Sequence, residues 1–484
     1  MQYSELRRCQ PAFEKFCRRY EGFLMDSRLR QFLRPYLLGL LGPLERKSIE
    51  PIALEQEIAM RPLQYFIGAS PWDERPMLAE HRRHVCETLG SEKGVLILDP
   101  TSFPKRGEHS VGVSRQWCGQ LGKQENCQVG GNLSYASEKG HAFLDRRLYL
   151  PKSWAFDLKR RRKAGVPDDV VFRTAWQLAR EMILIAHQEG IPHAWITGDE
   201  EFSKSMRFHD WLDEIGERFI FEVSVRAQVW LTLPRGRIWG REGLLERLAT
   251  LGPGRPRLTR VDKIAEELPH RAWTEVLIRN ASKGPIMVKA VALRVRSHYG
   301  FKKARPEGWL VLSETLDQRP ERKYFFSNAG PDSTLNAMLS AGYSRWPIEQ
   351  DHGQGKNETG LGDYETRTWL GWHHHTALSF LAHHFLVSQR NRLGGKIPGD
   401  DRRGGAACGE HGVPASRPLA GETRQAHGAP TAAQPRGEIR PLAQCPRTPR
   451  AARNHRTRRR PTSLGHRHSG LTKISRSIRT NFAQ

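Results

Sequence analysis

The first ninety residues have a helical hydrophobic pattern. Aromatic and leucine side chains recur at three- and four-residue steps, as at Phe13, Phe16 and Tyr20, and this is the period of an amphipathic helix. Pro43 interrupts the pattern, and another helix is expected after Asp73. Arg and Lys occupy the polar faces, so two interpretations are open for this region: a module that reads DNA, or a plain helical cover on the protein core.

From about residue 93 the pattern predicts strands that alternate with helices. Residues 95–98 form a continuous apolar run, which is typical of a strand buried on both faces. Residues 127–135 and 142–150 predict two further strands joined by a tight turn. A helix follows, with Asp168 or Asp169 as its expected cap. Two more strands with a shorter helix between them complete the predicted order βββαβαβ.

Residues 227–328 return to a strand pattern and predict a β-rich insertion. They contain a basic loop, Gly252–Arg257, which suits the minor groove of DNA and equally suits an ordinary surface loop. A helix is expected around residue 349. A last helical run begins at Thr376 and stops at Leu393 without a capping pattern.

After residue 393 the composition changes abruptly. Residues 394–484 contain 18 Lys+Arg, 5 Asp+Glu and one aromatic residue, Phe482. Such a segment buries too little apolar surface to offset its ordering entropy, so we expect a disordered tail that the chemistry does not require. It is either a basic arm that binds nucleic acid or an out-of-frame translation of a GC-rich gene. In the second case the apolar residues of 376–387 would lack their natural cover.

The charge of the chain indicates a polyanionic partner. The 484 residues carry a formal net charge of +25, which favours nucleic acid first and an anionic membrane surface second. No apolar run reaches the roughly 18 residues of a membrane span, and the N-terminus lacks a signal-peptide pattern. The seven cysteines form no disulfide framework in a chain of this length and are typical of reduced cytosolic thiols.

Three acidic residues are the candidates for chemistry. Asp99 and Asp199 each close an apolar run, and Glu349 lies four residues after Arg345 and seven before Lys356. A carboxylate at the end of a buried strand is held rigidly at the edge of a sheet. Three such groups can hold two divalent cations that cut and rejoin phosphodiesters. On a helix, Arg345 and Lys356 would share one face with Glu349 and contact flanking phosphates.

Simpler roles exist for the same residues. Asp99 can form a turn, Asp199 can cap a helix while Glu200 or Glu201 serves as the ligand, and Glu349 can form a surface ion pair. The histidine runs at 373–375 and 383–384 raise the question of a zinc site. Adjacent histidines on a helix point in different directions, and no cysteine spacing supports a zinc cage, so we do not assign one.

The three acids lie in blocks that resemble a known family. Residues 99–113, DPTSFPKRGEHSVGV, with 115–129, RQWCGQLGKQENCQV, resemble the first catalytic block of bacterial insertion-sequence transposases of the DDE superfamily. Residues 195–202, WITGDEEF, resemble the second block. Residues 345–349, RWPIE, with 360–367, GLGDYETR, resemble the third. The resemblance extends from about residue 10 to residue 392.

The resemblance implies an α/β fold with an RNase H-like mixed sheet flanked by helices. Asp99, Asp199 and Glu349 would be both catalytic and metal-binding, holding two Mg²⁺ or Mn²⁺ ions. The implied partners are double-stranded DNA, as terminal inverted repeats and target, and a second copy of the chain once assembled on DNA. The implied location is the bacterial cytoplasm, at the nucleoid. The DNA-binding candidates are Lys105, Arg115, Lys123, Tyr343, Arg345, Lys356 and Arg367.

Tyr343 departs from the family spacing, because Tyr-x-Arg stands here in place of Tyr-x-x-Arg. Two other functions stay open: a non-catalytic DNA-binding protein derived from a transposase, and a general metal-dependent nuclease. The expected organisation is a helical N-terminal region (1–90), the first part of the core (91–226), the β-rich insertion (227–328), the core helices with the third acid (329–393) and the tail (394–484).

Overall fold

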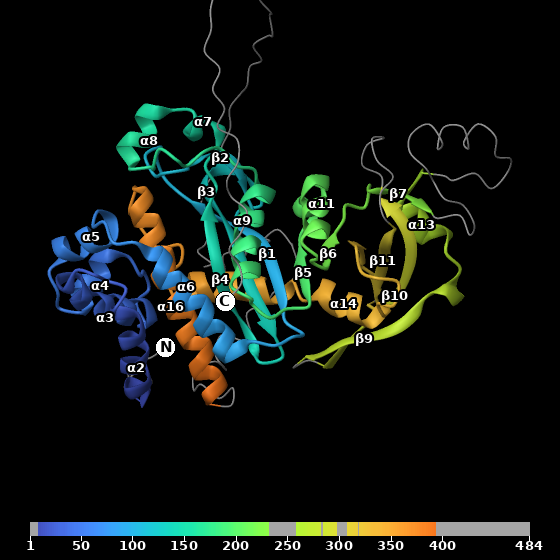
Figure 1. Cartoon of the computed structure of the whole chain (residues 1–484), viewed down its shortest axis with the longest axis horizontal. Helices are drawn as coiled ribbons and strands as arrows, with labels where there is room; N and C mark the ends of the chain where they lie inside the picture. Colours follow the sequence, from blue (N-terminus) through green and yellow to red (C-terminus); the bar gives the residue numbers. More distant parts are fainter. Residues whose placement is uncertain (1–7, 232–257, 282–283, 298–306, 318, 394–484) are drawn as a thin grey trace, which may run out of the picture. The chain divides into compact units, whose positions relative to one another are not determined.

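The structure, a computed structural model, describes residues 8–231, 258–281, 284–297, 307–317 and 319–393 (Figure 1). Residue contacts divide the chain into two units, 1–409 and 410–484, and all the described residues belong to the first. The basic loop Gly252–Arg257 and the tail 394–484 lie outside the described residues.

The N-terminal region is helical, as predicted, and packs on the last described helix, α16 (Trp369–Arg392). Side chains such as Leu33 and Phe66 form one buried cluster with Leu381 and Phe385 of α16. Residues 376–387, which an out-of-frame tail is expected to leave without cover, are all buried. The helices are α2 (Gln10–Glu21), α3 (Ser27–Leu41), α4 (Ile49–Glu55), α5 (Met60–Gly68) and α6 (Glu74–Leu89).

Among the described residues, twelve strands form one mixed sheet in the order β2-β3-β1-β5-β6-β12-β11-β10-β7-β8, with β4 on β3 and β9 on β10. The predicted insertion thus continues the sheet. The strands are β1 (Val95–Pro104), β2 (Ser114–Cys118), β3 (Lys123–Ser137), β4 (Gly140–Leu148), β5 (Trp195–Gly198), β6 (Phe219–Glu222), β7 (Gln228–Leu231), β8 (Leu258–Arg260), β9 (Thr274–Ala281), β10 (Gly284–Ser297), β11 (Gly308–Thr315) and β12 (Arg322–Ser327).

The central strands β1, β5 and β6 are parallel and are covered on both faces. Leu96 and Leu98 face a core shared with α9 (Ala175–Gln188), whereas Val95 and Ile97 face a core shared with α14 (Leu335–Tyr343) and α15 (Trp346–Glu358). This two-sided burial is why the run 95–98 has no polar member. The mixed sheet and its flanking helices confirm the predicted α/β class.

Two local expectations are corrected. Helix α9 begins after Thr174, whose side chain forms a capping box with Gln177, so neither Asp168 nor Asp169 is the cap. Strand β1 does not end at residue 98, because antiparallel pairing with β3 carries it on to Pro104, past Asp99. Only its parallel pairing with β5 stops at residue 98.

The remaining helical elements are short and connect the strands. They are α7 (Lys152–Ala155), α8 (Leu158–Ala164), α10 (Glu200–Ser203), α11 (Met206–Glu214), α13 (Val261–Glu267) and the 3-10 turn η1 (His270–Ala272). Over the described part of the chain, every helix is too short or too polar to cross a membrane.

Substitution of two glycines of α15 by alanine distinguishes the effect of helix propensity on stability from the effect of packing. Gly353 has open space where a Cβ would lie, so Gly353→Ala should stabilise the fold by up to about 1 kcal/mol. At Gly355 a Cβ would lie 2.8 Å from Cε2 of the buried Phe143 ring, so Gly355→Ala should cost about 1–3 kcal/mol. Urea denaturation compares the two variants, and equal stabilities would contradict the packing of α15 against β4.

Candidate active site

The parallel register of the sheet brings two aspartates to the same level. Leu98 of β1 pairs with Gly198 of β5, and the next residue in each segment is Asp99 or Asp199. Neighbouring strands lie about 4.8 Å apart, so the two carboxylates begin from adjacent backbone positions. Because side chains alternate along a strand, Asp99 lies on the same side as Ile97, which faces the core formed with α15.

Helix α15 brings the third acid to this place. Ile348 is buried in the core beneath the sheet, and the adjacent Glu349 is exposed to a cavity of about 940 Å³. Asp99 and Asp199 line the same cavity. The predicted triad therefore meets in one cavity, although its members are separated by 100 and 150 residues in the sequence.

Asp199 caps a helix and also lines the cavity. Its Oδ1 accepts a hydrogen bond of 3.0 Å from the backbone N–H of Glu201 and so caps α10. Its carboxylate also lines the cavity, as do Glu200 and Glu201. Those two neighbours are about half exposed and form ion pairs with Lys204, so Asp199 is the acid that the cap orients.

Arg345 is the cation at the centre of the acids. Its guanidinium donates to Glu222 at 3.0 Å, and it lies 3.4 Å from Glu349. Although burial opposes its charge, the pKa of Arg345 is raised by Asp99, Glu222 and Asp199. Glu222 ends β6 beside Asp199. It is not identified as a site residue from the sequence, because its only local indication is an acid at the end of another apolar strand.

His352, which sequence reasoning also missed, links Asp99 to β3. Burial, and then the charge of Lys356, lower the pKa of His352 to about 3, so its ring is neutral and carries one N–H. The Asn132 amide nitrogen lies 2.9 Å from Nε2 as a donor, which places the ring hydrogen on Nδ1. Nδ1 faces the Asp99 Oδ2 at 3.4 Å and thereby orients this carboxylate.

The surroundings of Asp99 disfavour its charge. Burial raises its pKa to about 7, and repulsion by Asp199 and Glu349 adds to this, while Arg345 acts in the opposite direction. Burial likewise raises the pKa of Asp199. Carboxylates whose pKa values are raised by burial and by one another mark a site where a cation would be stabilised.

The donor chemistry of the cavity fits a divalent cation, since hard ions such as Mg²⁺ prefer carboxylate oxygens. In the arrangement shown, no three His, Cys, Asp or Glu side chains of the described residues converge tightly enough to enclose an ion. In this arrangement Arg345 contacts both Glu222 and Glu349.

Among the predicted DNA contacts, Lys356 alone lines the cavity. Its ammonium donates to the Ser102 carbonyl at 3.1 Å and to Gln120 at 3.2 Å, and burial lowers its pKa. Tyr343 instead meets Ser313 of β11 through its hydroxyl at 3.0 Å. Four more predicted contacts do not line the cavity: Lys105 against Tyr364, Arg115 on the exposed face of β2, Lys123 beside Glu125, and Arg367 exposed before α16.

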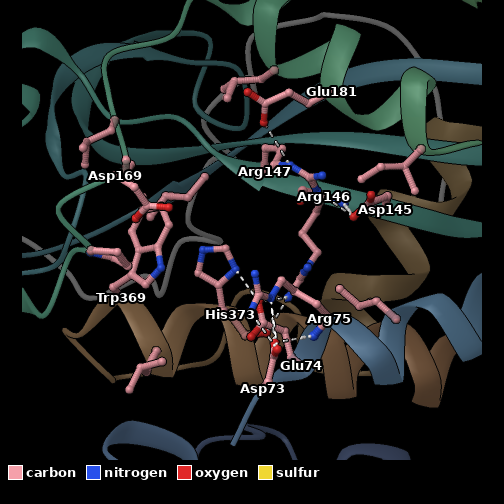
Figure 2. Close-up of a pocket in the computed structure, with 18 of the residues that line it drawn as sticks. Asp73, Glu74, Arg75, Asp145, Arg146, Arg147, Asp169, Glu181, Trp369 and His373 are labelled. Atoms are coloured by element: carbon pink, nitrogen blue, oxygen red, sulfur yellow. Dashed lines mark hydrogen bonds and ion pairs between the residues drawn. The ribbon is translucent and has the colours of Figure 1, made fainter. Parts of the chain in front are cut away.

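A second cavity, of about 660 Å³, lies between α6, β4, α9 and the start of α16 (Figure 2). Five arginines and five acids line it, and three of the acids lie beside arginines: Glu74 lies 3.6 Å from Arg146, and Asp145 and Glu181 lie 2.8 and 3.4 Å from Arg147. Because this cavity has no excess of negative charge, it lacks the feature that would recruit a metal ion. The cavity of Asp99 is the candidate active site.

Comparison with known proteins adds independent findings. The sequence model of a family described as DDE superfamily endonuclease matches residues 20–285. The chain is 25% identical over 320 residues to a probable transposase for insertion sequence element IS701 from Microchaete diplosiphon, over 61% of this chain and 80% of the relative. The crystal structure of the NurA nuclease from Sulfolobus solfataricus is similar over 58% of this chain and 86% of its own, at 11% identity and a TM-score of 0.27, too low to bear on the fold.

Asp99→Asn tests the electrostatic cost of the site in metal-free protein. The pKa of Asp99 is raised from 3.8 to about 7 by folding, so between these values the unfolded chain loses its proton while the folded chain keeps it. Stability therefore falls as pH rises through this window. The variant should exceed the wild type by about 2–4 kcal/mol above pH 7, and the gain should fade towards pH 4.

Urea denaturation in EDTA across this pH range measures the gain. Glu201→Gln, which removes an exposed carboxylate from the same cavity, is the control for a change of net charge and should show no such trend. A gain for Asp99→Asn that is constant with pH, or absent, would contradict the buried and repelled state of Asp99.

Proposed function

The chain belongs to the DDE superfamily of endonucleases, and from this premise we propose that it is a transposase, which cuts DNA at the ends of an insertion element and joins those ends to target DNA. The observation that carries the proposal is the meeting of Asp99, Asp199 and Glu349 in one cavity of a strongly basic chain. The similarity to a transposase of an insertion element supports it.

In this proposal Asp99, Asp199 and Glu349 would hold two divalent cations, Mg²⁺ or Mn²⁺. Such ions, when bound, supply an activated oxygen nucleophile and stabilise the charge that develops on a phosphodiester. The chain itself orients the ligands: the Glu201 N–H fixes one aspartate and His352 the other.

Arg345 and Lys356 bind the phosphates that flank the scissile bond. Both lie on α15 or at its start, near the acids, and both are held by contacts that a phosphate can replace: carboxylates for Arg345, and the Ser102 carbonyl and Gln120 for Lys356. A guanidinium binds phosphate oxygens in a forked geometry. Moving Arg345 to DNA would also free Glu349 for its role as a ligand.

The partners in this proposal are the terminal inverted repeats of the element and the target DNA, with two copies of the chain assembled on the repeats. Backbone contacts by basic side chains would supply affinity that decreases with salt. The helical N-terminal region and the β-rich insertion are the proposed sources of sequence specificity.

Asp199→Ala should abolish cleavage. Loss of one of three carboxylates removes an ion ligand without altering the buried core, so the rate of cleaving DNA that carries the element's terminal repeats should fall by more than about 100-fold in Mg²⁺. A gel-based nicking assay measures the rate. Asp168→Ala, at an exposed acid outside the cavity, is the matched control.

Each other outcome of that assay has a distinct meaning. Full activity of Asp199→Ala would exclude the proposed triad. DNA binding without Mg²⁺-dependent cleavage under any condition would identify a non-catalytic derivative of a transposase. Comparable cleavage of DNA without the repeats, or of RNA–DNA hybrids, would identify a general nuclease.

His352→Ala should slow cleavage by about 10- to 100-fold, because residues that orient metal ligands commonly have effects of this size. Binding of the repeat DNA in EDTA should be unchanged, which separates orientation of Asp99 from a DNA contact. His270→Ala, at an exposed histidine of η1, is the control. Unchanged cleavage by the His352 variant would show that Asp99 needs no partner on α15.

A further inference from the structure

The segment between β4 and α9 forms a small basic lobe, residues 152–164, which consists of α7 and α8. It contains six Lys or Arg residues and a single acid, Asp157. Asp157 is occupied as the cap of α8, where its side chain accepts a hydrogen bond from the Arg160 N–H. The lobe therefore has a positive charge that its own acid does not neutralise.

Two of the six cations build the lobe. Arg161 is buried and donates to backbone carbonyls on both sides of α8. Arg160 lies 4.0 Å over the Trp154 ring and donates to the carbonyl of Glu108. The other four are exposed, and none of them is within ion-pair distance of an acid among the residues that the structure describes: Lys152, Lys159, Arg162 and Lys163.

Apolar side chains stand exposed among these cations. Phe156 is 73% exposed and Leu158 is 60% exposed. They directly precede and follow Asp157. A charged surface that served only solubility would gain nothing from two large apolar side chains in water. Cations mixed with exposed apolar side chains are typical of a surface that contacts DNA backbone and sugars.

The chain on either side of the lobe lies at the rims of both cavities, since Leu150 and Pro167 line the second cavity. Tyr149 precedes the lobe, Thr174 follows it, and both residues line the cavity of Asp99. The Trp154 indole donates to the carbonyl of Val113 at 2.7 Å, which fixes α7 next to the start of β2 (Figure 1). DNA whose scissile phosphate lies at the acids would have its flanking duplex within reach of the rim of the Asp99 cavity.

We propose that the basic lobe is a second DNA contact, which binds the phosphate backbone of the duplex beside the scissile bond and packs Phe156 and Leu158 against its sugars. This inference rests on the proposed function only in taking DNA as the substrate. Lys159 and Lys163 are four residues apart and share one face of α8, so they form the centre of the contact.

The test is the salt dependence of duplex binding in EDTA, where no cleavage occurs. Lys159→Ala/Lys163→Ala should bind repeat DNA about 10-fold more weakly at low salt and reduce the slope of log Kd against log salt by about 2. Lys93→Ala/Lys139→Ala removes the same charge at the opposite end of β1 and β3 and should change neither quantity. Circular dichroism and the Tm confirm that both variants fold.

Phe156→Ala separates direct contact from long-range attraction. It should weaken binding several-fold while leaving the salt slope unchanged, because it removes an apolar contact and no charge. An unchanged slope in the Lys159 and Lys163 variant, or an equal loss in the Lys93 and Lys139 variant, would overturn the proposal. The proposal would also be overturned if the Lys159 and Lys163 variant lost binding to anionic phospholipid vesicles but kept its binding to DNA. That result would assign the lobe to a membrane surface.

Cleavage by the unaltered chain distinguishes this proposal from the proposed function. If the wild type cuts repeat DNA in Mg²⁺ and the lobe variant keeps its affinity and slope, only the lobe assignment fails. If the wild type neither binds nor cuts DNA, both proposals fail.

Discussion

Repulsion among Asp99, Asp199 and Glu349 is the constraint on which the candidate site depends. Two like charges about 4 Å apart repel by roughly 4 kcal/mol at an effective dielectric constant near 20, and burial adds a desolvation cost. Arg345 offsets part of this cost by lying among the acids, with Glu222 holding its other side. Divalent cations bound between the acids would reduce the same repulsion that Arg345 now reduces.

The position of α15 enforces this crowding. Asp351, fully buried on the side of the helix away from solvent, meets His141 of β4 at 2.6 Å and His383 of α16 at 3.5 Å. Although burial opposes it, these histidines lower the pKa of Asp351. Close approach of Gly355 to the Phe143 ring brings the helix against β4. A helix fixed in this way cannot move its acid away from the sheet.

Helix α16 is the support behind α15, and its histidines are structural. Nδ1 of His375 lies 2.7 Å from the Tyr36 hydroxyl, and Nε2 lies 2.8 Å from the Gly360 carbonyl. Burial lowers its pKa to about 4, so the neutral ring donates to the carbonyl and accepts from the phenol. The N-terminal helices complete the cover of α16, which makes them part of the scaffold whatever their role with DNA.

The sequence by itself determined the local elements and the chemistry of the acids, since apolar runs, helix periods and the residue types at Asp99, Asp199 and Glu349 are local properties. The capping box of Thr174 and Gln177 is also a local pattern, but Asp168 and Asp169 are equally common capping residues and lie a few positions earlier. Only the tertiary structure decided the continuation of β1 past Asp99, because its hydrogen bonds come from β3. It likewise decided the contact of His352 with Asn132 across 220 positions, because burial and partner choice arise only when distant segments pack.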